Sequence, residues 1–207
     1  MGCINANNRD FFYTQVKNGT ETFLLYEKNN DGLNHYTETC GPTSLWNGCE
    51  AMNIDIKPFA GKGLRPADHT FEWLNTPWNF SKLPNWNGCI AGQVPGNEVQ
   101  YWLPIAMKEI YNVNCLFHEG LSFDDVVNIL NQGHAVQLAR KIGHFIVAVD
   151  YDQTNDKIIY WDSFPNYIQP DETIVDDGTG GFRRTIDRDW FTANLNPRFI
   201  EIVNQGN

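Results

Sequence analysis

The sequence predicts a single α+β domain in which one helix is followed by an antiparallel sheet. The chain has 207 residues, which is the length of one compact domain with a sizeable core. After Cys40, apolar residues recur at helical spacing, at Leu45, Trp46, Cys49 and Met52. Towards the C-terminal end, short apolar runs predict three strands, at 135–139, 145–151 and 157–162. We therefore treat 1–207 as one domain.

Composition and charge exclude several classes of protein. Hydrophobic residues make up 42% of the chain and charged residues 19%, which is typical of a folded globular protein. The net charge of −10 would repel a phosphate backbone, so we expect no nucleic-acid partner. No apolar run reaches the roughly 18 residues of a membrane span. The segment 1–8 lacks the basic and apolar regions of a signal peptide. We therefore expect a cytoplasmic protein, for which any extracellular or particle-associated action would require an indirect route of export.

The cysteines predict free thiols and no metal site. They are five in number, widely spaced and never in a Cys-x-x-Cys pair, at positions 3, 40, 49, 89 and 115. We expect neither a disulfide framework nor a zinc site. The thiol chemistry considered below for Cys40 also needs no organic cofactor. Cys49 lies two and a half helical turns after Cys40, on the far side of the predicted helix, so it should be buried and inert.

The N-terminal part, 1–33, reads as a hairpin and a polar loop. The runs 11–16 and 22–27 are rich in strand-forming residues and flank Asn18-Gly19, a pair favoured in type I′ turns. A helix over 42–52 follows, with Gly41-Pro42 where proline is tolerated at a helix start.

The region 53–96 predicts an irregular lobe rich in tryptophan, glycine, proline and asparagine. Trp73, Trp78 and Trp86 stand there in otherwise polar sequence. Two interpretations remain open for these side chains, because loops on a rigid scaffold often line a substrate groove, but aromatic residues also anchor long loops to a core.

Two further helices are predicted before the strands. Asn97 can cap a helix with an apolar stripe that includes Leu103, and Pro104 should kink it. Ser122 and Asp125 resemble a capping box at the start of the next helix, and Gly133 should close that helix.

Cys40 is the candidate nucleophile. A thiol at a helix N-terminus faces unpaired backbone N–H groups and the positive end of the helix dipole, and both favour the reactive thiolate. A cysteine can equally be a small buried hydrophobic residue, so its position alone leaves both interpretations open.

His144 is the candidate base among five histidines. It follows Gly143 and begins the predicted strand 145–151, so the backbone should hold it rigidly while Gly143 leaves room for a neighbour. The other four histidines fall in loop-like surroundings, in the tryptophan-rich lobe or just after a helix end, at positions 35, 118, 69 and 134.

Strand register makes Asp162 the candidate partner of His144. If the turn 152–156 centres the hairpin, Ile146 faces Asp162, and His144 becomes a diagonal neighbour of Asp162 on the same face. Their side chains are then within reach of a hydrogen bond, whereas a slip of one residue would move Asp162 to the other face. Asp162 can equally be a turn former before Ser163.

Three motifs resemble the bacteriocin-processing (double-glycine leader) peptidase family and its stand-alone relatives. The segment 39–45, TCGPTSL, resembles the nucleophile motif of that family. The segment 143–152, GHFIVAVDYD, resembles its histidine strand, and 158–163, IIYWDS, resembles its acid strand. The order of the motifs also matches, so the resemblance extends over about 34–202.

The resemblance implies a papain-like cysteine peptidase fold, with the nucleophile helix packed on an antiparallel sheet, and hydrolysis of peptide amide bonds by Cys40, His144 and Asp162. Members usually carry a glutamine six residues before the cysteine as an oxyanion donor, and this chain has Asn34 there, with the same amide on a shorter stem. Since stand-alone relatives include cell-wall endopeptidases, peptidoglycan peptides are the expected substrate. Two alternatives remain, namely a binding or assembly module of a larger particle with a dispensable site, and an acyl transferase that uses the same thiol.

Overall fold

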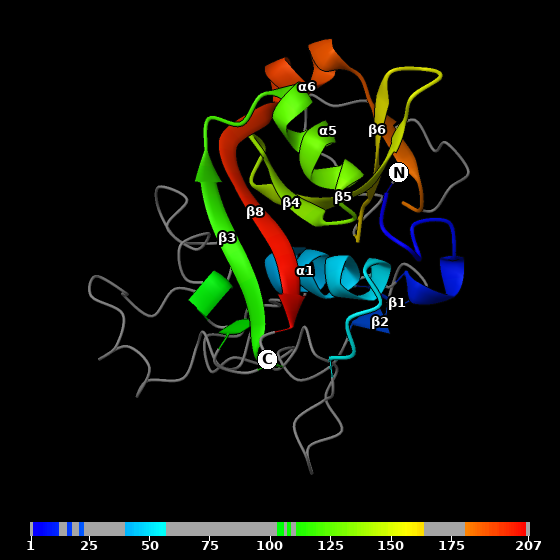
Figure 1. Cartoon of the computed structure of the whole chain (residues 1–207), viewed down its shortest axis with the longest axis vertical. Coiled ribbons are helices and arrows are strands. Elements are labelled where there is room, and N and C mark those ends of the chain that lie inside the picture. Colours follow the sequence, from blue (N-terminus) through cyan, green and yellow to red (C-terminus); the bar gives the residue numbers. More distant parts are fainter. Residues whose placement is uncertain are drawn as a thin grey trace.

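The computed structural model contains a six-stranded antiparallel sheet with helices on both faces, which confirms the predicted α+β class (Figure 1). The structure describes residues 2–12, 16–17, 21–22, 40–56, 103–105, 107–108, 111–163 and 181–205. The strand order is β3-β8-β4-β5-β6-β7. These strands are β3 (Val113–Glu119), β4 (Ala135–Arg140), β5 (His144–Asp152), β6 (Lys157–Trp161), β7 (Arg184–Ile186) and β8 (Leu195–Gln205).

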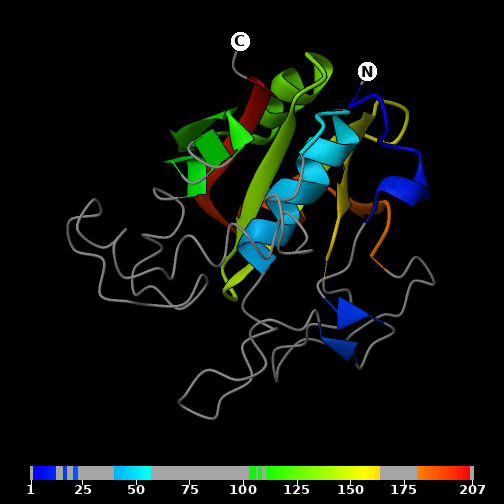
Figure 2. The ribbon, with the colours of Figure 1, turned by 90° about the horizontal axis from the view of Figure 1, so that it is seen from below.

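Helices cover the two faces of this sheet (Figures 1 and 2). Helix α1 (Cys40–Ala51) packs on one face, and α5 (Phe123–Asn131) and α6 (Arg188–Asn194) pack on the other. Strand β5 alternates between the two cores, because Val147 faces α1 whereas Ile146 faces α5. The predicted strand therefore carries an unbroken apolar run, which is the pattern of a strand buried on both sides.

Helix α1 lies close to the sheet at Gly48. A Cβ atom added there would overlap the side chain of Ile202 and would lie 3.1 Å from Val147 Cγ2. The missing side chain thus lets the helix that begins at Cys40 approach the central strands closely. The predicted helix over 42–52 is confirmed, with its start two residues earlier, at Cys40.

The start of α5 confirms the predicted capping box. The Ser122 hydroxyl accepts from the Asp125 N–H at 3.2 Å, and the Asp125 carboxylate accepts from the Ser122 N–H at 2.9 Å. Gly133 follows the helix with a φ of +83°, a left-handed conformation that favours glycine. Of the other predicted helix, residues 103–105 and 107–108 are helical, whereas Asn97 lies outside the described residues.

The hairpin of β5 and β6 has the predicted register at the Asp162 end only. Val147 pairs with Trp161, as the predicted alignment requires. At the turn, Asp152 pairs with Lys157, one residue out of the predicted alignment, and a bulge between Ala148 and Asp150 absorbs the difference. A β-bulge inserts one extra residue into one strand. The one-residue shift in pairing near the turn is therefore absent at the other end of the hairpin, where Asp162 lies.

The N-terminal hairpin is present in a shorter form. Strand β1 (Val16–Lys17) pairs antiparallel with β2 (Glu21–Thr22). Lys17 pairs with Glu21, so three residues separate the paired positions, one more than in a two-residue type I′ turn. Phe11 was predicted in the first strand but lies in a 3-10 helix, η1 (Arg9–Phe11).

Three strands, β3, β7 and β8, were not predicted. In β3 and β8 polar residues interrupt the apolar pattern, as His118 and Glu201 do. The prediction that His118 lies in a loop is wrong, because His118 is in β3. The polar residues of this strand made it resemble a loop. Within the ranges that the structure describes, no helix is long and apolar enough to cross a bilayer.

Candidate active site

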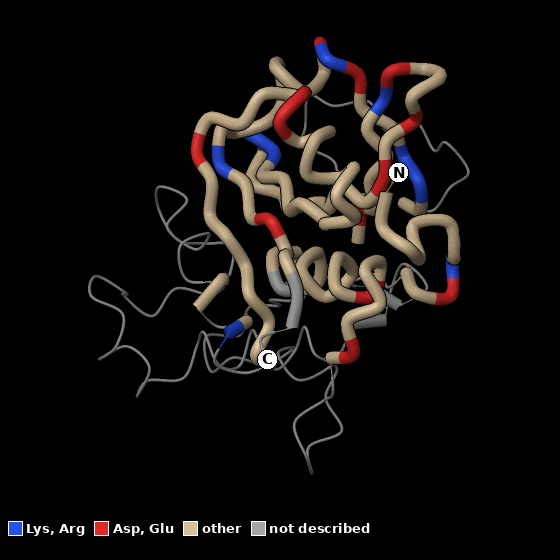
Figure 3. The backbone as a smooth tube through the Cα atoms, in the orientation of Figure 1, with Lys and Arg blue, Asp and Glu red and all other residues tan. Residues whose placement is uncertain are grey.

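Cys40 is the first residue of α1. The residue is 3% exposed and belongs to the core between α1 and the sheet. At the start of a helix the backbone N–H groups have no partner within the helix and favour negative charge. The only charged residue of α1 is Glu50, in its last turn (Figure 3). Among the described residues, the ionisable partner found for the thiol is His144 of the sheet.

The sheet places His144 against both Cys40 and Asp162. His144 is the first residue of β5, and its Nε2 lies 2.7 Å from Asp162 Oδ1, in the hydrogen bond that the register predicted. Gly143, just before it, has a φ of +81°, and no atom of the described residues lies within 4 Å of the position a Cβ would take. The prediction that Gly143 makes room for a neighbour is therefore not supported by these residues, and the glycine serves the backbone conformation.

Burial and charge act in opposite directions on His144. Burial disfavours the imidazolium and lowers the pKa, but the charge and hydrogen bond of Asp162, with a hydrogen bond and charge from Cys40, outweigh it and raise the pKa to about 9. The imidazolium is thus the favoured form of His144 at neutral pH.

Asp162 lies just after β6 and is held from two directions. The side chains of Asp162 and His144 are each 2% exposed. The Asp162 N–H donates to the Gly181 carbonyl at 2.8 Å, and Arg184 Nη1 lies 3.4 Å from Asp162 Oδ2. Sequence reasoning missed Arg184, because nothing in the local pattern ties a residue of β7 to the end of β6.

Gln137 is a second residue that the sequence analysis missed. It is fully buried in β4, and its Nε2 donates to the Gly41 carbonyl at 2.9 Å and to Ser44 Oγ at 2.7 Å. These bonds hold the first turn of the helix that carries Cys40. The signal was a lone amide in the apolar run 135–139, since a polar group in a buried strand needs a partner.

The other described cysteines differ from Cys40 in their surroundings. Cys3, Cys49 and Cys115 are free thiols, and burial raises their pKa, to about 12 for Cys3 and Cys115. The prediction that Cys49 is buried is confirmed. Cys89 lies outside the described residues.

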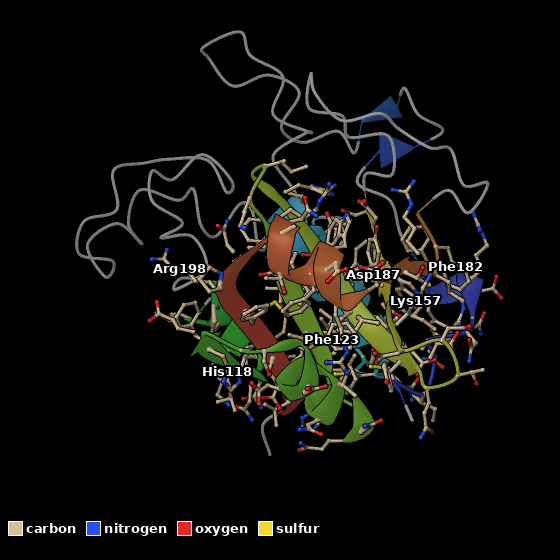
Figure 4. All side chains as sticks on the ribbon, turned by 90° about the horizontal axis from the view of Figure 1, so that it is seen from above. His118, Phe123, Lys157, Phe182, Asp187 and Arg198 are labelled. Carbon is tan, nitrogen blue, oxygen red and sulfur yellow. The ribbon has the colours of Figure 1, made fainter. Side chains whose placement is uncertain are left out.

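Two of the competing histidines are bound to a different carboxylate. His118 Nε2 and His134 Nδ1 lie 2.8 Å and 2.6 Å from the two oxygens of Glu201. Figure 4 shows His118 on the β3 side of the sheet, away from Lys157 at the start of β6. Among the described residues, no group of three or more His, Cys, Asp or Glu side chains is arranged to hold a metal ion.

Several predicted site residues lie outside the described residues. These are the proposed oxyanion donor and the three aromatic residues of the irregular lobe, Asn34, Trp73, Trp78 and Trp86. The site described here therefore consists of Cys40, His144 and Asp162 with their supporting side chains.

We expect the chain to lose stability as pH rises from about 6.5 to about 9. The folded pKa of His144 lies above the ordinary value of 6.5, so its contribution is complete below 6.5 and is lost as pH passes through 9. The loss should be on the order of 3 kcal/mol. Urea unfolding across this range measures it. In Asp162→Asn the loss should be much smaller, and an identical pH dependence in both proteins would contradict the assignment.

A sequence model of the Peptidase_C39 like family matches residues 20–180, which is more than half of the chain. The chain belongs to this family. Membership in the Peptidase_C39 like family places it among the papain-like cysteine peptidases, without identifying it as a bacteriocin-processing member. The matched segment contains Cys40, His144 and Asp162.

Comparison with individual proteins adds little. Among solved structures the chain is similar to UfSP from C. elegans, with 13% identity and a TM-score of 0.32. The alignment covers 72% of this chain and 32% of the UfSP chain, so the chain spans about a third of that protein. No curated protein matches the chain. A similarity of this size carries no argument about the reaction.

Proposed function

We propose that the chain hydrolyses peptide amide bonds with Cys40 as nucleophile, His144 as acid and base, and Asp162 as the group that orients His144. One observation carries the proposal: a buried imidazole is hydrogen-bonded to Asp162 and to Cys40, which stands at a helix N-terminus. Nucleophile, base and orienting acid are the three parts of a catalytic triad.

In the proposed reaction the Cys40 thiolate attacks the carbonyl carbon of the scissile amide. The oxyanion accepts hydrogen bonds from the Cys40 N–H and from the Asn34 side chain. His144 gives its proton to the departing amine, and the acyl group stays on sulfur as a thioester. His144 then takes a proton from water, which attacks the thioester and frees the acid and the thiol.

The substrates that we propose are stem or bridge peptides of peptidoglycan. Support comes from the motifs that resemble stand-alone members of the bacteriocin-processing family, some of which act on cell walls. Trp73, Trp78 and Trp86 would line the groove that receives the peptide.

Selective alkylation tests the proposed nucleophile. Near neutral pH, iodoacetamide should modify Cys40 faster than any other thiol, as measured by mass spectrometry of digested protein. Cys3 is a matched control, because it is 5% exposed against 3% for Cys40, and because no histidine among the described residues acts on its thiol. Equal, slow labelling of Cys3 and Cys40 would contradict the proposal.

A further inference from the structure

The carboxylate of Asp162 has a separate cationic neighbour on each of its oxygens. His144 Nε2 lies 2.7 Å from Oδ1, and Arg184 Nη1 lies 3.4 Å from Oδ2. The Arg184 side chain is only 15% exposed, so solvent screens this pair weakly. The guanidinium is thus a fixed part of the surroundings of Asp162.

Charge balance indicates what this guanidinium does. A thiolate, an imidazolium and a carboxylate together carry one net negative charge, and Arg184 neutralises it. When His144 gives up its proton, its ring becomes neutral, and Arg184 is then the cation that remains on Asp162 in the part of the chain that the structure describes. A buried carboxylate without a charged partner tends to take up a proton, whereas a guanidinium stays charged at every stage.

We propose that Arg184 is a positioning residue that keeps Asp162 ionised throughout the reaction and thereby keeps the Nε2 proton on His144. An ionised carboxylate only accepts hydrogen bonds, so it holds the ring with hydrogen on Nε2 and leaves Nδ1 for Cys40. A protonated Asp162 could donate to Nε2 instead and reverse the tautomer. The inference rests on the function proposed above.

The fold holds Arg184 and Asp162 together through β7. Arg184 begins β7 and pairs with Tyr160 of β6, two residues before Asp162. The turn that leads into β7 also accepts the Asp162 N–H at Gly181, whose φ is +89°. One segment therefore holds both the backbone and the side chain of Asp162.

The other charged groups of the neighbouring elements have partners of their own. Arg140 of β4 is opposite His144, and its guanidinium lies over the Trp190 ring, 5.3 Å from the centroid. Arg183 lies 3.7 Å from Asp150 of β5 and donates to the Ala6 carbonyl. Among the described residues, Cys40 is the remaining titratable group on His144.

The test is the pH dependence of Cys40 alkylation by iodoacetamide in the full chain. In Arg184→Gln the net negative charge of the three groups is no longer balanced, so the Cys40 thiolate is less favoured. The acid limb, which is the part of the profile where the alkylation rate rises with pH, should therefore move to higher pH by about one unit. At a fixed pH on that limb, labelling should be about tenfold slower. Arg184→Lys keeps the charge and should restore the midpoint. The acid limb of kcat/KM for a cleaved peptide should move in the same way.

Two controls separate this role from a structural one. Arg183→Gln removes the same charge one residue away and should leave the midpoint unchanged. In an Asp162→Asn background, Arg184→Gln should cause no further shift, because the effect acts through Asp162. Circular dichroism verifies that each variant is folded.

Distinct outcomes would overturn the two proposals. An unmoved midpoint in Arg184→Gln, with slower labelling at every pH, means a structural role only, and a shift of equal size in Arg183→Gln means a general charge effect. A shifted midpoint in Arg184→Lys also contradicts the inference, even if Arg184→Gln fails to fold. If wild-type Cys40 titrates as an ordinary thiol, the proposed function itself is contradicted.

Discussion

Replacement of Cys40 by alanine should abolish peptide hydrolysis. The thioester with substrate forms on this sulfur, so its loss removes the covalent path, and the expected fall in rate is on the order of 10⁴-fold or more. Alanine is smaller and apolar, and Cys40 begins its helix, so the fold should persist. The measurement is mass spectrometry of products from peptidoglycan and, separately, from a mixture of soluble peptides.

A matched variant controls for the loss of a thiol as such. Cys115→Ala removes a free cysteine of β3, away from the site, and should retain activity. Hydrolysis that persists in Cys40→Ala would exclude Cys40 as the nucleophile. Cleavage of soluble peptides but not of peptidoglycan would leave the mechanism intact and contradict the proposed substrate.

Replacement of Asp162 by asparagine should slow hydrolysis by about 10² to 10⁴-fold, less completely than the loss of Cys40. The carboxylate forms no bond to substrate, but it fixes the tautomer of His144 and supports its positive charge. An asparagine amide can donate to Nε2 and so favour the wrong tautomer. The acid limb of Cys40 alkylation should also move to higher pH, because the imidazolium beside the thiolate is less favoured.

Asp150→Asn is the control for this variant. Asp150 lies on β5, the strand of His144, and forms an ion pair with Arg183. Among the described residues, no interaction between Asp150 and the His144 ring is found. Its replacement should leave rate and alkylation profile unchanged. Full activity in Asp162→Asn, together with a wild-type alkylation profile, would make Asp162 a turn former.

The features that could be predicted from sequence are set by nearby residues. The capping box of Ser122 and Asp125 spans one helical turn, and β5 and β6 form a hairpin across four turn residues. The contact of His144 with Asp162 was predictable because a hairpin register follows from its turn, although the bulge in β5 shows that the turn alone did not fix every pair.

The features that could not be predicted depend on distant segments. Strand β8 contains Pro197 and the buried Glu201, which weaken an apolar pattern, and only its pairing with β3 and β4 makes it a strand. Arg184 reaches Asp162 because β7 pairs with β6, and no sequence pattern near either strand predicts that pairing. The support of the site was therefore harder to predict than the three residues at its centre.

The position of β8 in the sheet also constrains the order of folding. This strand lies between β3 and β4, and it pairs Val113 with Gln205 and Ala135 with Ile202, so both contacts join segments far apart in the chain. Closing such long loops costs entropy before any contact can offset it, and β-sheet pairing of this kind is slow. The strand that comes last of the six along the sequence thus completes the interior of the sheet, and Ile202 on that strand forms part of the surface on which Gly48 of α1 rests.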